Sequence, residues 1–252
     1  MPPSSRREFL HLALAGAVPL VGQTAPPPAP RGGPRADEFV FARLRYDSGD
    51  WDYNPKVAAN VLNSVVEYTT LRVYPEEVVI TADSDELGAF PFLFMTGHRL
   101  VRFSDRERQG LRAWVRSGGL LFSDDCNHDI AGLYATSFER EMRQLFPGPA
   151  TLAKLPRSHP LYRAFFPFAE GPPQTAHELN GWGDDLVHDY LRGVEHDGRL
   201  GVLYSNKDYG CEWDYDWRNK RFQRRQHQVR GQHRRACDVL VGDCHRAPGH
   251  AR

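Results

Sequence analysis

Residues 118–129 constrain the fold more than any other part of the chain. The stretch begins with a glycine pair that can end a helix and continues as the apolar run 120–122. It then breaks into Ser-Asp-Asp-Cys-Asn-His-Asp. This order is typical of a buried strand that carries a polar cluster at its carboxyl end. Ligands of open α/β sheets bind beyond the carboxyl ends of the strands, so this cluster is the first place to look for a functional site.

Apolar runs alternate with segments of helical spacing along the middle of the chain. Strand-like runs occupy residues 39–46, 90–95, 120–122 and 199–205, with a further short strand in 71–73 or 78–80. Helices are predicted after the cap Asn54 and behind the capping boxes at residues 104–107 and 136–139. We therefore expect an α/β fold with a doubly wound, mostly parallel sheet and helices on both faces.

The first 25 residues have the pattern of a twin-arginine signal peptide. Arg6 and Arg7 precede Phe9 and Leu10, and the modestly apolar run 12–21 follows. Residues 26–37 are rich in proline and predict an extended linker, which leaves 38–225 as a single α/β domain. We expect a periplasmic or other extracytoplasmic protein. No transmembrane helix remains if the signal is cleaved, and the segment stays as an anchor if it is not.

The charge balance gives no reason to expect a polyanionic partner. The chain of 252 residues has 32 acidic and 32 basic side chains and a formal net charge of zero. Neither nucleic acid nor an anionic membrane surface is therefore an expected partner. We expect a small polar ligand or a periplasmic or membrane protein instead, and the sequence identifies no cofactor.

Several ordered motifs resemble one bacterial family. They are the strand 39–46 with the following Asp50 and Trp51, the run 92–98, the stretch 118–126, and residues 159–161. Over roughly residues 38–222 the chain is similar to the family catalogued as domain of unknown function 4159. The resemblance implies a fold similar to class I glutamine amidotransferase-like and flavodoxin-like domains. It implies no reaction.

The segment 226–252 departs from the family pattern. It has no apolar periodicity, whereas the family continues into a closing apolar segment. Codons permitted for residues 226–235, read one base later, encode an amphipathic segment of the kind expected there. The tail is therefore predicted to be disordered, either through a frameshift or as an ordinary basic tail.

Polar residues that follow the predicted strands form the candidate ligand site. They are Tyr46, Asp50, Trp51, Gly97, His98, Asp124 and Asp125. The late strand 199–205 also opens into polar residues, at 206–211. Because the carboxyl ends of parallel strands meet at one edge, we expect Asp124, Asp125 and His98 to lie within about 10 Å of one another, the scale of a single pocket mouth.

Cys126, His128 and Asp125 are the candidate catalytic residues, because an amidotransferase-like fold places its nucleophile just past a strand. Two features count against a thiol nucleophile. The flanking Asp125 and Asn127 do not form the tight G-x-C-x-G elbow, and neighbouring carboxylates raise the pKa of a thiol. The alternative is a buried structural cysteine, which could pair with Cys211 in an exported protein.

Asp124, Asp125 and His128 also offer oxygen and nitrogen ligands suited to a divalent metal ion, although aspartates at strand ends often cap helices. Two functions stay open. The first is a non-catalytic exported module whose polar crevice binds a ligand or a protein partner. The second is a hydrolase or amidotransferase-like enzyme that uses the cluster from Asp124 to Asp129, with or without a metal. The missing elbow favours the first.

Overall fold

The computed structural model describes residues 33–148, 151–165, 167–181 and 183–214. The predicted signal peptide, the first part of the linker and the tail 226–252 lie outside these residues. From Pro34 onward the described chain belongs to one compact unit. No helix in the described ranges is long and apolar enough to cross a membrane.

One sheet organises the described part of the chain, and its strands follow the order β2-β1-β3-β4-β7-β6-β5. The strands are β1 (Ala42–Arg45), β2 (Val78–Thr81), β3 (Phe92–Gly97), β4 (Leu120–Asp125), β5 (Ala153–Lys154), β6 (Arg192–His196) and β7 (Arg199–Ser205). The first five in space are parallel, whereas β6 and β5 extend the sheet antiparallel beyond β7. The predicted α/β fold with a mostly parallel sheet is confirmed.

The strand order places a topological switch point between β1 and β3. The chain leaves β1 for β2 on one side and returns to β3 on the other, so the loops after β1 and β3 separate there. The parallel part of the sheet has the 2-1-3-4-5 order of flavodoxin-like folds, with β7 as the fifth strand. The carboxyl ends of β1, β3, β4 and β7 therefore share one edge.

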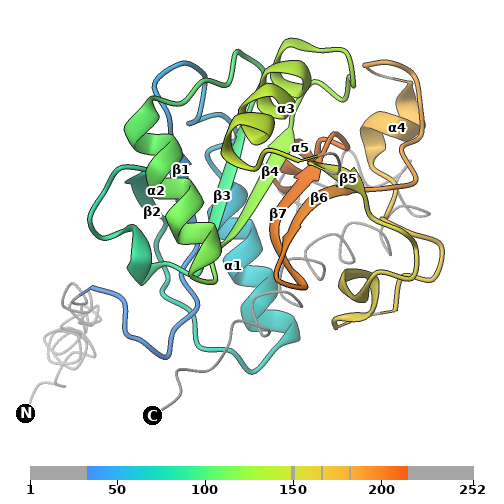
Figure 1. Ribbon diagram of the computed structural model, residues 1–252. Coiled ribbons are helices and arrows are strands. Elements are labelled where there is room, and N and C mark those ends of the chain that lie inside the picture. Colours follow the sequence, from blue (N-terminus) through green and yellow to red (C-terminus); the bar gives the residue numbers. More distant parts are fainter. Residues whose placement is uncertain (1–32, 149–150, 166, 182, 215–252) are drawn as a thin grey trace, which may run out of the picture. The chain divides into compact units, whose positions relative to one another are not determined.

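Helices cover both faces of the sheet (Figure 1), as the prediction of a doubly wound fold requires. α2 (Asp105–Arg116) and α3 (Leu133–Leu145) pack on one face, and α1 (Val57–Tyr68) and α5 (Tyr209–Asp214) on the other. In β3, Leu93 and Met95 point to the first face and Phe92 and Phe94 to the second. All six β3 residues are buried, which explains its nearly continuous apolar sequence.

The helix starts agree with the sequence prediction at one of three places. Ser104 and Glu107 form the expected capping box of α2. The prediction for Thr136 is wrong, because α3 begins after Gly132 and the Thr136 hydroxyl donates back to the Gly132 carbonyl. The prediction for Asn54 is also wrong: α1 begins at Val57, and Asn54 adopts a left-handed conformation with φ 59° that asparagine tolerates well.

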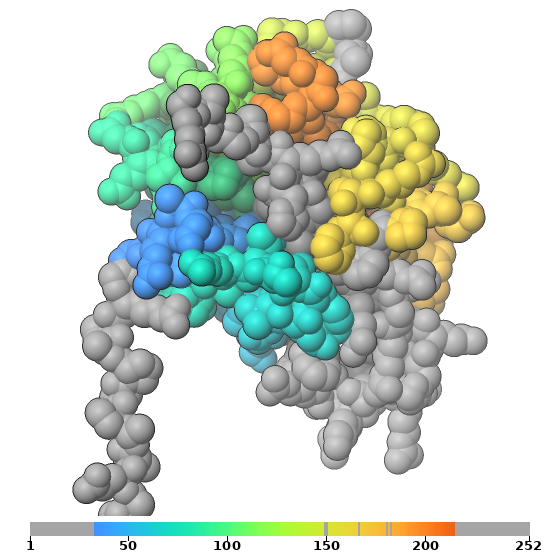
Figure 2. All heavy atoms as spheres, turned by 90° about the horizontal axis from the view of Figure 1, so that it is seen from below, coloured from blue at the N-terminus to red at the C-terminus, as the bar shows by residue number. Residues whose placement is uncertain are grey.

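Several short elements were not predicted. They are the 3-10 turn η2 (Leu87–Ala89), the strands β5 and β6, and the helices α4 (Ala176–Asn180) and α5. A further 3-10 turn, η3, spans Pro160–Arg163. Figure 2 views the domain from the amino ends of the parallel strands, where the β6–β7 hairpin (orange) and the segment between α1 and β2 (teal) reach the surface. The carboxyl ends lie at the opposite edge, together with α4 and the start of α5 (Figure 1).

Candidate functional site

Asp50 and His98 form a polar pair across the switch point. Asp50 lies in the loop after β1, and His98 directly follows β3. The Asp50 carboxylate contacts His98 Nδ1 at 2.9 Å and accepts the His98 amide at 2.9 Å and the Arg99 amide at 3.2 Å. Burial alone would raise the pKa of Asp50, but the His98 and Arg99 hydrogen bonds outweigh it and hold this pKa below its usual value. The two side chains remain 18% and 30% exposed.

Arg43 of β1 fixes the position of the loop that carries Asp50. This buried guanidinium pairs with Glu77 at 2.5 Å and donates to the carbonyls of Tyr53 at 2.9 Å and Asn54 at 3.1 Å. The Tyr53 ring in turn meets the His98 ring edge-on, with centroids 4.1 Å apart. One buried cation thus positions both the carboxylate loop and the aromatic ring beside the imidazole.

Gly97 and Tyr46 pack next to the Asp50–His98 pair and shape the loops that carry it. Tyr46 is buried and donates its hydroxyl to the Thr96 carbonyl at 2.9 Å. A Cβ at Gly97 would lie 2.5 Å from the Tyr46 hydroxyl and 2.6 Å from Asp50 Oδ1, and its φ of 155° favours glycine. Trp51 is partly buried and packs against the core. Tyr46, Trp51 and Gly97 therefore shape the loops, while Asp50 and His98 reach solvent.

Asp124 and Asp125 end β4 beside β3, in register with Thr96 and Gly97 respectively, and His98 directly follows Gly97, so these residues stand at the same end of the sheet. Both are fully buried. Asp124 accepts the Gly210 amide at 2.6 Å, whereas its Oδ1 has no hydrogen bond of good geometry among the described residues. Asp125 accepts from the Asn127 amide at 2.9 Å and the Tyr204 hydroxyl at 3.1 Å.

Burial dominates the protonation of this carboxylate pair. It raises the pKa of Asp124 to about 7, although the Gly210 amide, Ser205 and the Tyr209 amide act in the opposite direction. Burial likewise raises the pKa of Asp125 to about 7, and the charge of Asp124 adds to the rise. Asp124 therefore binds the start of α5, and Asp125 binds the loop after β4 and Tyr204 of β7, while neither carboxyl faces solvent.

Cys126 lies deep beneath the same edge. Its sulfur is 2.9 Å from Thr96 Oγ1 and accepts from Asn54 Nδ2 at 3.2 Å. Cys211 reaches the same Asn54 side chain, with its sulfur 3.6 Å from Oδ1, and both cysteines are free thiols. Burial raises the pKa of Cys126 well above its usual value, and Cys211 adds to the rise. The two thiols, whose pairing the sequence left open, are thus unbridged and contact the same Asn54 side chain.

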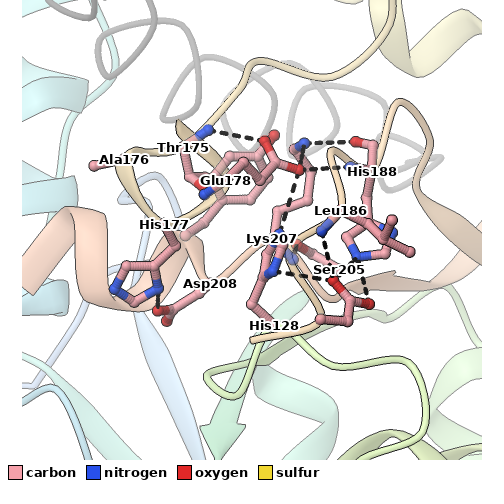
Figure 3. Close-up of polar contacts among 12 residues, drawn as sticks. His128, Thr175, Ala176, His177, Glu178, Leu186, His188, Ser205, Lys207 and Asp208 are labelled. Carbon is pink, nitrogen blue, oxygen red and sulfur yellow. Dashed lines mark hydrogen bonds and ion pairs between the residues drawn. The ribbon is translucent and has the colours of Figure 1, made fainter. Parts of the chain in front are cut away.

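A second cluster of charged residues connects α4, the loop after it and the loop after β7 (Figure 3). Lys207 is fully buried, contacts the Glu178 carboxylate and donates to the His188 carbonyl at 2.6 Å. Glu178 also accepts the His188 amide at 2.8 Å and the Thr175 amide at 3.0 Å. Burial lowers the pKa of Lys207 even though Glu178 opposes this effect.

His128 joins this second cluster rather than Asp124 and Asp125. Its Nε2 lies 3.5 Å from Glu178 Oε1, and its Nδ1 lies 3.5 Å from Asp184 Oδ1. His188 Nε2 contacts the same Asp184 carboxylate at 3.1 Å. Close by, His177 pairs with the buried Asp208. The carboxyl edge therefore holds far more ionisable groups than the sequence prediction assigned to it.

Sequence reasoning missed the groups that come from α4 and the loop after it, which are His177, Glu178, Asp184 and His188. It expected the polar run 206–211 at this edge but named neither Lys207 nor Asp208 as a site residue. One usable signal is present, because Thr175 and Glu178 have capping-box spacing and do form a capping box at α4. Another is the polar run after β7, which supplies Lys207 and Asp208.

The molecule is a doubly wound α/β domain. At the carboxyl ends of its strands it has a partly exposed pair, Asp50 and His98, and a group of buried ionisable side chains that includes Asp124, Glu178 and Lys207. The chain belongs to the family described as Domain of unknown function (DUF4159), whose sequence model matches residues 40–236. The match runs beyond residue 222, where the resemblance was expected to end, and includes the first part of the segment 226–252. A search of curated proteins gives no match.

Proposed function

We propose that this domain is an exported, non-catalytic binding module that takes a small polar ligand at the switch point between β1 and β3. One observation carries the proposal: Asp50 and His98, from the two loops that separate there, are bonded to each other and still reach solvent. Crevices at switch points are where open α/β sheets bind ligands. A carboxylate that accepts Nδ1–H fixes the imidazole tautomer and leaves Nε2 as an acceptor.

The geometry of Cys126 supports binding rather than thiol catalysis. A nucleophilic cysteine needs access to substrate and a stabilised thiolate. Cys126 is buried, its sulfur is engaged by Thr96 and Asn54, and its pKa is raised by burial. These properties favour a structural thiol over the nucleophile of an amidotransferase-like or hydrolytic enzyme.

A thermal-shift screen with defined polar compounds tests the binding proposal. Monosaccharides, amino acids, dipeptides and dicarboxylates would be added to the wild type and to Asp50→Asn, His98→Ala and His196→Ala. The last is a matched control, because His196 also pairs with an aspartate, Asp197, but in the β6–β7 hairpin at the opposite edge. A ligand present at about 100 times its Kd adds about 2.7 kcal/mol to the free energy of unfolding.

The binding proposal expects a stabilising compound for the wild type and His196→Ala that has no effect on Asp50→Asn or His98→Ala. A compound that stabilises all four proteins equally would place the ligand elsewhere. If no compound in these classes stabilises the wild type, a small polar ligand of this kind is excluded, and a protein partner becomes the alternative.

The export part of the proposal rests on Arg6 and Arg7 and the apolar run that follows them. Replacing both arginines by lysine keeps the charge but removes the guanidinium pair that the twin-arginine machinery reads. We expect the double variant to accumulate as cytoplasmic precursor, while the wild type is recovered from the periplasmic fraction. Equal export of the two would contradict the localisation.

A further inference from the structure

We propose that His128, Asp184 and His188 bind a divalent transition-metal ion of the Zn²⁺ type. This inference goes beyond ligand binding at Asp50 and His98 and does not depend on it. His128 comes from the loop after β4, and the other two residues come from the loop after α4. Their ligand atoms all lie within 4.8 Å of one another. Two imidazoles and one carboxylate are a donor set that suits Zn²⁺ and its neighbours.

The separations from Asp184 to the two imidazoles match those around one small ion, and the two imidazole nitrogens lie within 4.8 Å of each other. His128 Nδ1 lies 3.5 Å from Asp184 Oδ1, and His188 Nε2 lies 3.1 and 3.2 Å from the two Asp184 oxygens. Ligands at about 2.0–2.2 Å from a tetrahedral Zn²⁺ are roughly 3.3–3.6 Å apart. Asp184 therefore already stands at a suitable distance from both imidazoles, and side-chain rotation would bring all three groups onto one ion.

The two nitrogens of His128 face different carboxylates, with Nε2 3.5 Å from Glu178 Oε1 and Nδ1 3.5 Å from Asp184 Oδ1. A metal ion bound to Nδ1 and Asp184 would therefore leave Nε2 directed at Glu178.

Glu178 would then serve as the carboxylate that orients a metal-bound histidine. It is itself fixed by the Lys207 ammonium, by the Thr175 amide at 3.0 Å and by the His188 amide at 2.8 Å. The same His188 that supplies a ligand nitrogen thus holds the supporting carboxylate through its backbone. Figure 3 shows His128, Glu178, His188 and Lys207 gathered in this cluster.

The two loops are shaped to bring the ligands together. The Asp184 amide donates to the His128 carbonyl at 3.1 Å, and the Leu186 amide donates to Asp184 Oδ1 at 3.1 Å. Gly183 has a φ of 74°, and a Cβ there would lie 2.1 Å from the His128 carbonyl oxygen. The close approach of the loops therefore requires glycine at this position.

Three protein ligands leave a fourth position open, which is typical of Zn²⁺ sites that hold water or another small ligand. The Asp184 side chain is 15% exposed, so the cluster has contact with solvent. A competing group exists in Cys126, Asp208 and Cys211, whose ligand atoms also lie within 4.8 Å of one another. Thiols must lose their protons to bind metal, and burial works against this at Cys126.

Titration of the chelator-treated, full-length protein with Zn²⁺ and Co²⁺ distinguishes these sites. Calorimetry gives the Zn²⁺ affinity, and the Co²⁺ spectrum reports the ligands, since thiolate ligands add an intense charge-transfer band in the near ultraviolet. The variants are Asp184→Asn, His188→Ala and Glu178→Gln, with His196→Ala and the double variant Cys126→Ser/Cys211→Ser as controls. Circular dichroism confirms that each metal-free variant is folded.

We expect one equivalent of Zn²⁺ and a tetrahedral Co²⁺ spectrum without a thiolate band. Asp184→Asn and His188→Ala should weaken Zn²⁺ binding by at least about 100-fold, and Glu178→Gln by roughly 10–100-fold. Both controls should bind like the wild type. The proposal is overturned if the wild type binds no Zn²⁺, if Asp184→Asn and His188→Ala leave the affinity unchanged, or if binding shows a thiolate band and disappears in the cysteine double variant.

Discussion

The Asp50–His98 pair and the Lys207–Glu178 pair lie at the same edge of one sheet but differ in solvent access. Asp50 and His98 are 18% and 30% exposed, whereas the side chains of Lys207 and Glu178 are completely buried. Water screens and solvates the first pair when one partner is removed. It cannot do so for the second, because the remaining charge would stay buried and unpaired.

Under the proposed function, this difference separates ligand recognition by Asp50 and His98 from support of the fold by Lys207 and Glu178. A side chain that contacts an incoming ligand must reach solvent, and of these two pairs only Asp50 and His98 do so. The buried ionisable residues instead connect segments distant in sequence: Asp124 binds the start of α5, and Lys207 binds α4. The predictions below test this division, beginning with the largest effect.

Replacing Lys207 by methionine should destabilise the protein most. The Glu178 carboxylate would lose its ammonium partner in a buried position, and breaking such a pair costs about 3–5 kcal/mol. Urea unfolding measures this loss. The matched variant Arg143→Met removes one partner of the exposed Arg143–Glu139 pair on α3 and should unfold almost like the wild type. Equal losses in the two variants would contradict the role given to burial.

Replacing Gly97 by alanine should have the next largest effect. The unfavourable φ costs about 1–3 kcal/mol, and the new Cβ would collide with the Tyr46 hydroxyl and Asp50 Oδ1. Gly198→Ala is the control, because Gly198 also has a positive φ of 71°, but a Cβ added there would have no atom within 4 Å. Gly97→Ala should therefore lose more stability than Gly198→Ala in the same urea titration. If Gly97→Ala lost less stability than Gly198→Ala, Tyr46 and Asp50 would not crowd Gly97.

The pH dependence of stability should change when Asp125 is replaced by asparagine. The pKa of Asp125 is about 7 in the folded protein and close to 3.8 when unfolded, so the folded state binds more protons between these values. Stability therefore falls as pH rises from about 4 to about 7. Asparagine cannot ionise, so the wild type should lose more stability than Asp125→Asn between about pH 5 and pH 8.

The control for this pH experiment is Asp105→Asn, which changes an aspartate that is 94% exposed. Its stability should decline with rising pH as much as that of the wild type. If the stabilities of Asp125→Asn and Asp105→Asn decline in parallel as pH rises, the Asp125 carboxyl does not retain its proton in the folded state.

Much of the sheet was predictable because its central strands are buried on both faces. The runs in β3, β4 and β7 are nearly all apolar, and each ends in polar residues at one edge. That pattern is sufficient to predict Asp50, His98 and Asp124 at a common edge. It could not tell that Asp124 is buried while His98 reaches solvent, because exposure at a strand end depends on which loops fold over it.

The residues missed by sequence reasoning share a physical cause. Lys207 and Glu178 are 29 positions apart, and only the packing of α4 against the loop after β7 brings them into contact. α4 spans only five residues, too few for a helical pattern to be recognised. His128 was assigned to Asp124 and Asp125 by closeness in sequence, but its left-handed φ of 49° turns the chain there and the side chain meets Glu178 and Asp184.

The division between recognition and support is tested most directly by the free energy of unfolding of His98→Ala, measured in urea beside Lys207→Met. His98 is partly exposed and pairs with a carboxylate that keeps its backbone hydrogen bonds from residues 98 and 99. We predict that His98→Ala loses no more than about 1 kcal/mol, the scale of an exposed ion pair. A loss as large as that of Lys207→Met would show that His98 holds the fold together and would contradict its assignment to ligand binding.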